Sequence, residues 1–110
     1  MKFQAQRETL LKPIQAVIGV VERRQTMPIL ANMLVAVTKE GLSVTASDLE
    51  VELVARAEVA ADDVGEVTVP GRKFLDIIRA LPDGSKVSLS TERDRLVIKS
   101  GKSRFTLSTL

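Results

Sequence analysis

The chain has 110 residues, of which 45% are hydrophobic and 27% are charged, a composition typical of a single domain with a real core. It contains no cysteine and no histidine, which excludes disulfides, thiolate metal sites and histidine-based acid–base catalysis. No apolar run reaches the roughly 18 residues that span a membrane, and the first residues lack the apolar segment of a signal peptide. We therefore expect a cytoplasmic protein without a cofactor, a metal ion or a membrane partner.

The net charge is only +2, but it is unevenly distributed along the chain. Residues 40–66 hold one basic and eight acidic side chains, whereas residues 93–104 hold five basic and one acidic. Residues 1–39 are also basic, with six basic and two acidic side chains. This asymmetry favours one surface that meets an anion or an acidic partner. Chance clustering on solvated strand faces explains it equally well.

The first half of the chain predicts a strand, a helix and three more strands. Residues 1–7 alternate between apolar and polar side chains, as in a half-buried strand. Apolar residues at helical spacing then predict a helix over about 8–20, with Pro13 early in it. A polar loop with Arg23 and Arg24 follows. The next three strands are expected at 29–38, 42–47 and 50–59. In the last of these, the alternation directs Val51, Leu53, Ala55, Ala57 and Val59 inward.

The second half repeats this order after an acidic connector at 60–65. A strand begins at Glu66, and the segment 69–84 predicts a helix. Pro70 suits the first helical turn, and the sequence Pro82-Asp83-Gly84 ends the helix. The apolar face of this helix comprises Phe74, Ile77, Ile78 and Leu81, and the opposite face comprises Arg72, Asp76 and Arg79. Strands follow at about 86–91, 94–99 and 103–109.

The repeated order predicts an α+β fold built from a duplicated β-α-β-β-β unit, with half-repeats at about 1–60 and 66–110. Each unit ends in three antiparallel strands joined by tight turns. The pattern amounts to two helices and eight strands. Both helices should pack on one face of the antiparallel sheets and leave the other face free.

No catalytic constellation or phosphate-binding glycine loop is present. The densest carboxylates are the pair Glu50 and Glu52 and the pair Asp62 and Asp63. A weak cation site or an acid–base pair is one interpretation of them. Solvated charges on an outer strand and a connector are the better one, because no convergent acidic motif supports the first. An enzyme is therefore not expected.

Helix geometry favours a polyanion-binding surface. Two helices on one sheet face would present their polar sides to the same solvent, with the loop of Arg23 and Arg24 at the edge. Cationic groups that face one way suit a phosphate backbone, whereas aromatic side chains for base stacking are scarce. Ion pairs of Arg72 and Arg79 with Asp76 are the simpler alternative. The surface would comprise Lys12, Gln15, Arg72 and Arg79.

The final strand has two interpretations. Phe105 and Leu107 share one side, while Arg104 and Thr106 take the other. The apolar pair could pack in the core, or the strand could be an exposed edge that receives another chain. The sequence ends abruptly at Leu110, directly after the expected final strand, so we expect a fragment of a longer chain.

Five stretches, in the same order, resemble the bacterial sliding clamp, the beta subunit of DNA polymerase III. They are MKFQAQRETLLKPIQAV, MPILANMLV, TASDLEVELVAR, VPGRKFLDIIRALP and SGKSRFTLSTL. The resemblance spans 1–110 and implies a DNA-clamp domain, the first of three, with the other two absent. It implies a head-to-tail homodimer whose six domains form a ring around double-stranded DNA. The ring would tether DNA polymerase III to its template and would bind DNA without sequence specificity. The polymerase and the clamp loader would bind through the missing domains.

The resemblance also implies roles for particular residues. Arg24 and Arg72 match DNA-contacting positions of the family. Lys12, Gln15 and Arg79 are added from helix geometry, and Arg23 is left undetermined because many clamps have a small or glycine pair before the arginine. The subunit interface would comprise Phe105 and Leu107 as its apolar part, with Lys73, Lys102 and Arg104 as its basic rim. The rival hypothesis is a non-catalytic interaction module that oligomerises through its last strand and binds an acidic protein.

Overall fold

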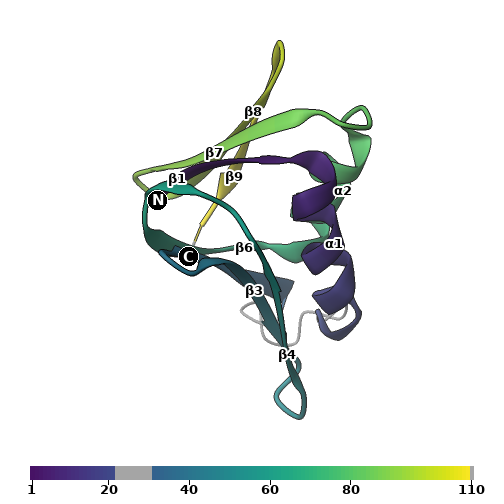
Figure 1. Ribbon diagram of the computed structural model, residues 1–110. Coiled ribbons are helices and arrows are strands. Elements are labelled where there is room, and N and C mark those ends of the chain that lie inside the picture. The colour runs from purple at the N-terminus through teal and green to yellow at the C-terminus, as the bar shows by residue number, and fades with distance from the viewer. Residues whose placement is uncertain (22–30, 110) are drawn as a thin grey trace.

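The computed structural model describes residues 1–21 and 31–109. Within them, two α-helices, one 3-10 turn and nine strands form the α+β architecture that the sequence predicts (Figure 1). In chain order the elements are β1 (Lys2–Gln6), α1 (Arg7–Val17), η1 (Ile18–Val20), β2 (Asn32–Thr38), β3 (Gly41–Ser47), β4 (Glu52–Ala57), β5 (Ala61–Asp63), β6 (Gly65–Pro70), α2 (Gly71–Ala80), β7 (Lys86–Glu92), β8 (Arg95–Ser100) and β9 (Ser103–Ser108).

The strands form two antiparallel sheets, and each sheet combines strands from both halves of the chain. The five-stranded sheet has the order β5-β1-β7-β8-β9, and the four-stranded sheet has the order β4-β3-β2-β6. Phe3 of β1 lies opposite Leu89 of β7, and Val69 of β6 lies opposite Met33 of β2. The first strand of each β-α-β-β-β unit therefore pairs with the meander of the other unit.

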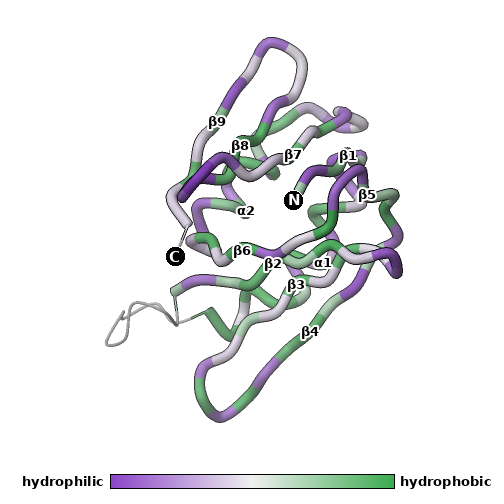
Figure 2. The backbone as a smooth tube through the Cα atoms, turned by 90° about the vertical axis from the view of Figure 1, so that its left-hand side faces the viewer, coloured by the Kyte–Doolittle hydropathy of each residue, from purple (hydrophilic) through white to green (hydrophobic). Residues whose placement is uncertain are grey.

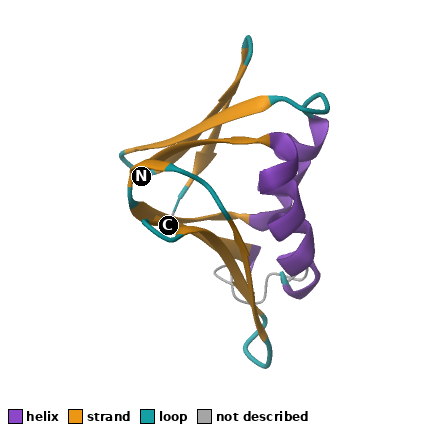
Figure 3. Ribbon diagram, in the orientation of Figure 1, coloured by secondary structure: helices purple, strands orange, loops and turns teal. Residues whose placement is uncertain are grey.

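Both helices lie on the same side of the two sheets (Figure 3). They contact each other, and α1 also contacts β3 and β4. Their apolar stripes are buried, because a short amphipathic helix gains most of its stability from tertiary packing. The helical core residues are Leu10, Ile14, Val17, Phe74, Leu75 and Ile78, and they meet the inward residues Phe3, Met33, Val35, Leu89, Leu96 and Ile98 in one cluster.

The helix boundaries differ slightly from those that the sequence predicts. α1 ends at Val17, and the expected last turn is the 3-10 turn η1. α2 begins at Gly71, directly after Pro70. A Cβ atom at Gly71 would lie 3.0 Å from side-chain carbons of Met33 and Val21, so close packing at this helix start favours glycine.

Two expectations for the segment 50–65 are wrong. The sequence pattern directs Val51 and Leu53 inward, but they are 46% and 37% exposed. Leu53 lies at the start of β4, an edge strand, and Val51 lies in the turn before it, whereas the later residues Ala55, Arg56 and Ala57 line the hollow beside α1. In addition, part of the expected connector is the short strand β5, which pairs with β1. The described residues therefore hold nine strands rather than eight.

Candidate nucleic-acid interface

The exposed side of the helix pair holds four of the predicted DNA-binding residues. Lys12 and Gln15 lie on α1, and Arg79 is exposed in the last turn of α2. Arg72 is half-buried in the first turn of α2. Because the two helices contact each other on one side of the sheets, these side chains belong to one layer of the molecule (Figure 1).

Arg7 fastens the two helices together at one end. Its guanidinium group donates hydrogen bonds to the backbone carbonyls of Ile78 (3.2 Å) and Arg79 (2.9 Å), which lie at the end of α2. The same group forms ion pairs with Glu8 (3.0 Å) and Asp83 (3.2 Å). The last carbonyls of a helix lack partners within the helix, and the helix dipole favours a cation there. Arg7 therefore acts as a structural cap and its charge is neutralised.

The remaining helical cations are not neutralised in this way. Among the described residues, neither Lys12 nor Lys73 forms an ion pair, and the same is true of Arg72 and Arg79. The alternative interpretation, ion pairs with Asp76, is therefore not seen. The Nε atom of Arg72 is buried and makes no hydrogen bond with a described residue.

Arg24, the family arginine of the polar loop, and its neighbour Arg23 lie outside the described residues. Their roles stay predictions from the sequence.

The residues predicted for the subunit interface come from two elements. Arg104, Phe105 and Leu107 lie on the edge strand β9, and Lys102 is exposed in the turn before it. Lys73 is exposed on α2. Phe105 lies opposite Ile98 and Leu107 lies opposite Leu96, so both face the core. Leu107 is only 6% exposed and packs in the core of this chain, whereas Phe105 is partly exposed.

Sequence reasoning missed a second basic surface, on the outer face of the five-stranded sheet. Lys99 of β8 lies directly opposite Arg104 of β9, an unfavourable like-charge pair. Alternation within the strands signals this face, since its basic residues alternate with buried apolar ones. Its basic residues are Lys2, Lys86, Arg95, Lys99 and Arg104; the acidic Glu92 lies 3.8 Å from Arg104, and Asp63 lies opposite Lys2 at the other edge.

The carboxylates considered as a cation site lie in different parts of the domain. Asp63 lies 3.6 Å from the N-terminal ammonium group, and Glu50 and Glu52 are exposed near the β3–β4 turn. Within the described residues, no group of three or more potential ligands could hold a metal ion. The same residues include no helix long and apolar enough to cross a membrane.

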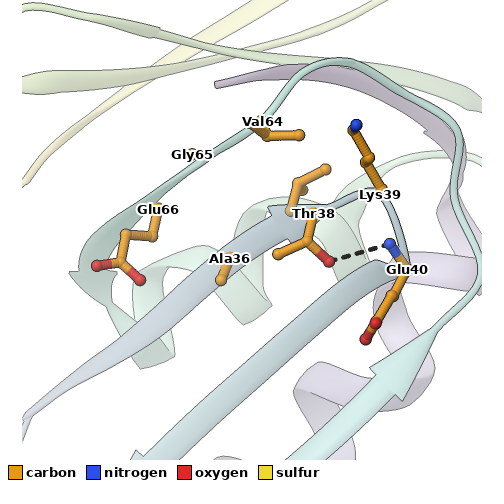
Figure 4. Close-up of a pocket in the computed structure, with 8 residues that line it drawn as sticks. Ala36, Thr38, Lys39, Glu40, Val64, Gly65 and Glu66 are labelled. Atoms are coloured by element: carbon orange, nitrogen blue, oxygen red, sulfur yellow. Dashed lines mark hydrogen bonds between the residues drawn. The ribbon is translucent and has the colours of Figure 1, made fainter.

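A shallow hollow lies on the four-stranded sheet between the β2–β3 turn and the β5–β6 region (Figure 4). The backbone N–H of Glu40 donates to the Thr38 hydroxyl at 3.1 Å on one side of it. Glu40, Glu66 and Lys39 are its charged residues, so it lacks the excess of positive charge that the helix pair shows.

The architecture, with paired helices on one side of two antiparallel sheets, defines an α+β domain of the clamp type. Residues 1–110 match the family described as the DNA polymerase III beta subunit, N-terminal domain. The chain therefore belongs to this family and corresponds to its first domain.

Individual relatives agree with this assignment. The beta sliding clamp of Pseudomonas aeruginosa is 53% identical over 111 residues, and that of Escherichia coli K12 is 50% identical. A crystal structure of the DnaN sliding clamp from P. aeruginosa, bound to griselimycin, superposes with a TM-score of 0.96 over the whole chain at 53% identity. A Caulobacter crescentus beta clamp gives 0.96 at 44% identity. The chain spans about 30% of the length of each of these proteins.

Proposed function

We propose that this chain is one domain of a ring that encircles double-stranded DNA and keeps a DNA polymerase III on its template. The helix pair faces the duplex and contacts its phosphates without reading the bases. The domain does no chemistry itself. The polymerase and the clamp loader bind through other domains of the full protein, which acts in the cytoplasm.

The observation that supports this proposal is the unneutralised charge of the helix pair. The two helices hold five basic and two acidic side chains, and only Arg7 among the basic ones is ion-paired within the described residues. Phosphate contacts of this kind are independent of sequence. A ring remains on DNA through its topology, so a modest number of phosphate contacts is sufficient and permits sliding.

The subunit contact is the second part of the proposal. Arg104 and Lys102 provide a basic rim at the edge strand β9, and the partly exposed Phe105 provides an apolar contact. Lys73 completes the basic rim in the proposal, and Leu107, which packs in the core of this chain, supports Phe105 from beneath. Its partner is an acidic surface of a second clamp subunit in a head-to-tail homodimer.

The test of the DNA surface is a titration of the chain with fluorescent duplexes of unrelated sequence at several salt concentrations. We expect weak binding that is the same for every sequence. The logarithm of the binding constant should fall linearly with the logarithm of salt, by about 0.9 for each phosphate neutralised. Arg72→Gln and Arg79→Gln should each make this slope shallower.

A matched control separates the two basic surfaces. Lys86→Gln and Lys99→Gln remove the same charge from the outer face of the five-stranded sheet. They should leave the salt slope of DNA binding unchanged. If these variants reduce the slope while Arg72→Gln and Arg79→Gln do not, the helix pair is not the DNA surface. A strong preference for one duplex sequence would also overturn the proposal.

A further inference from the structure

The hollow beside the β2–β3 turn has an apolar floor and a volume of about 580 Å³. Ligand pockets usually measure about 300–1,000 Å³ and combine an apolar lining with a few polar groups. Ala36 of β2 lies opposite Glu66 of β6, and Val37 lies opposite Gly65. Because the side chain of Ala36 is small and Gly65 has none, the surface above these two strands stays open.

Val64 provides an exposed apolar wall of this hollow. Its exposed fraction is 52%, and it lies between β5 and β6 (Figure 4). Among the described residues, the other exposed large apolar side chains belong to the β3–β4 turn and to β4, and they are Leu49, Val51, Leu53 and Val54. The tip of the β3–β4 hairpin projects away from β5 and β6 (Figures 1 and 2). Val64 therefore forms a separate apolar spot, inside a polar rim, which is the usual anatomy of a protein–protein contact.

The rim of the hollow is mainly acidic. Glu40 lies on the β2–β3 turn and Glu66 lies on β6, and neither carboxylate forms an ion pair within the described residues. Lys39 is the basic residue of the lining. Residues 58–66, which include the Val64 wall, hold four acidic side chains and no basic one. This charge favours a cationic ligand and disfavours nucleic acid or an acidic protein.

The turn that forms the second wall is held in place by the chain itself. The backbone N–H of Glu40 donates to the Thr38 hydroxyl at 3.1 Å, and Thr38 pairs with Gly41 in the β2–β3 ladder. Gly41 has a φ angle of +122°, a conformation that glycine adopts at little cost. A wall that is already ordered lowers the entropic cost of binding a partner.

We propose that this surface, the acidic hollow of Ala36, Glu40, Val64 and Glu66, binds a basic linear segment of another protein. A large aliphatic side chain of that segment packs on Ala36 and Val64. Arginine or lysine side chains on either side of it pair with Glu40 and Glu66. Such a segment matches both the apolar floor and the charge of the rim.

The acidic hollow lies apart from the helix pair. Ala36 alternates along β2 with the buried Val35 and Val37, so it lies on the face of the four-stranded sheet that points away from the core. The helices pack on the core side of the sheet. A peptide can therefore bind whether or not the helix pair is occupied, and this inference does not depend on the proposed DNA function.

The test is an NMR titration of the isotope-labelled chain with a short peptide that has leucine between two arginines and has both ends blocked. We expect saturable shifts in the backbone amide signals of residues 36–40 and 64–66, and weaker binding as salt increases. A peptide with serine in place of the leucine should bind at least about fivefold more weakly. A peptide with glutamates in place of the arginines should show the same loss.

Two variants of the chain test the wall and the rim separately. Val64→Asn removes the apolar wall, and the double variant Glu40→Gln with Glu66→Gln removes the negative charge of the rim. Each should weaken binding of the leucine peptide by about fivefold. The double variant should also make binding less sensitive to salt.

Matched controls come from the same acidic half of the chain. Val54→Asn replaces another exposed valine, on β4, and Glu50→Gln with Glu52→Gln removes the same charge near the β3–β4 turn. Both controls should bind the peptide like the parent chain. The amide signals away from the hollow show whether each variant keeps the parent fold.

Several results would overturn the inference. One is the absence of saturable shifts, and another is a set of shifts centred outside residues 36–40 and 64–66. Equal binding of the serine or glutamate peptide would exclude the apolar or the charged contact. An equal loss of binding in the control variants would show a general attraction between the acidic chain segment and a cationic peptide.

Discussion

The guanidinium group of Arg7 donates a hydrogen bond to the backbone carbonyl of Arg79 across 2.9 Å, from the first residue of α1 to the last turn of α2. A second bond from the same group reaches the carbonyl of Ile78. The Arg7 side chain is only 12% exposed. The Arg7 side chain thus caps the end of α2 and holds it against the start of α1.

Arg7→Ala should therefore destabilise the domain. Two helix carbonyls lose a charged donor, and a charged hydrogen bond contributes about 1.5–3 kcal/mol. We expect the free energy of unfolding to fall by about 2–3 kcal/mol in urea titrations at neutral pH. Arg7→Lys keeps one donor and the charge, and should recover part of this loss. An Arg7→Ala variant as stable as the parent chain would contradict the capping role.

The second prediction concerns Glu8 and pH. The backbone N–H of Gly84 and the guanidinium group of Arg7 donate to its carboxylate and hold the pKa of Glu8 below its ordinary value near 4.5. Because the folded state favours the ionised carboxylate, this lowered pKa stabilises the fold at pH values above the ordinary pKa of Glu8. This stabilisation is lost as the pH falls through the lowered pKa.

Glu8→Gln should consequently lose stability at neutral pH and lose less of it on acidification than the parent chain. Urea unfolding at neutral pH and below the ordinary pKa of Glu8 measures the difference. Asp48 offers a comparison, because hydrogen bonds from the backbone N–H groups of Val51 and Glu50 also lower its pKa. If Glu8→Gln and the parent chain lose the same free energy of unfolding on acidification, Glu8 does not contribute to the pH dependence of stability.

The third prediction concerns Gly41 at the start of β3. Its φ angle is +122°, and a Cβ atom there would lie 2.7 Å from the carbonyl oxygen of Ala57. Gly41→Ala should lower the free energy of unfolding by about 3 kcal/mol, from backbone strain and a steric clash together. Gly101→Ala is the matched control, since Gly101 has a φ of +57° but a Cβ atom added to it would meet no atom within 4 Å. It should cost only about 1 kcal/mol.

The fourth prediction concerns Leu49 in the β3–β4 turn. Leu49 has a φ angle of +81° and is 69% exposed, so it gains little burial for its unfavourable backbone conformation. Leu49→Asn should raise the free energy of unfolding by about 0.5–1 kcal/mol, because asparagine tolerates positive φ. Val64→Asn, at another exposed apolar residue, should change stability little. Thermal unfolding of both variants at low protein concentration distinguishes strain relief from a general effect of replacing an exposed apolar side chain.

Local patterns were sufficient to predict both helices and most strands. The spacing of Phe74 and Ile78, for instance, places them on the buried face of α2, where the structure has them. The pattern fails at Leu53, because alternation records which face a residue takes and not whether another element covers that face. The Arg7 contact joins residues more than 70 positions apart, and no local signal predicts it.

The candidate site was predictable in type but not in detail. Helical periodicity correctly placed Gln15 and Arg79 on the exposed sides of their helices. It did not reveal that Arg72 is half-buried, since burial there depends on how α2 packs. The outer basic face of the five-stranded sheet was missed because Lys99 and Arg104 come from different strands, and only their register brings them together.

The exchange of β1 and β6 between the two sheets has a consequence for folding. Neither half of the polypeptide can complete its hydrogen-bonded ladders by itself, because residues 1–60 lack the partner β6 and residues 66–110 lack the partner β1. Long-range pairing must precede a finished core, which slows folding and ties the two halves into one cooperative transition. The two repeats are thus interlocked, and neither should survive as an independent module when the chain is cut between them.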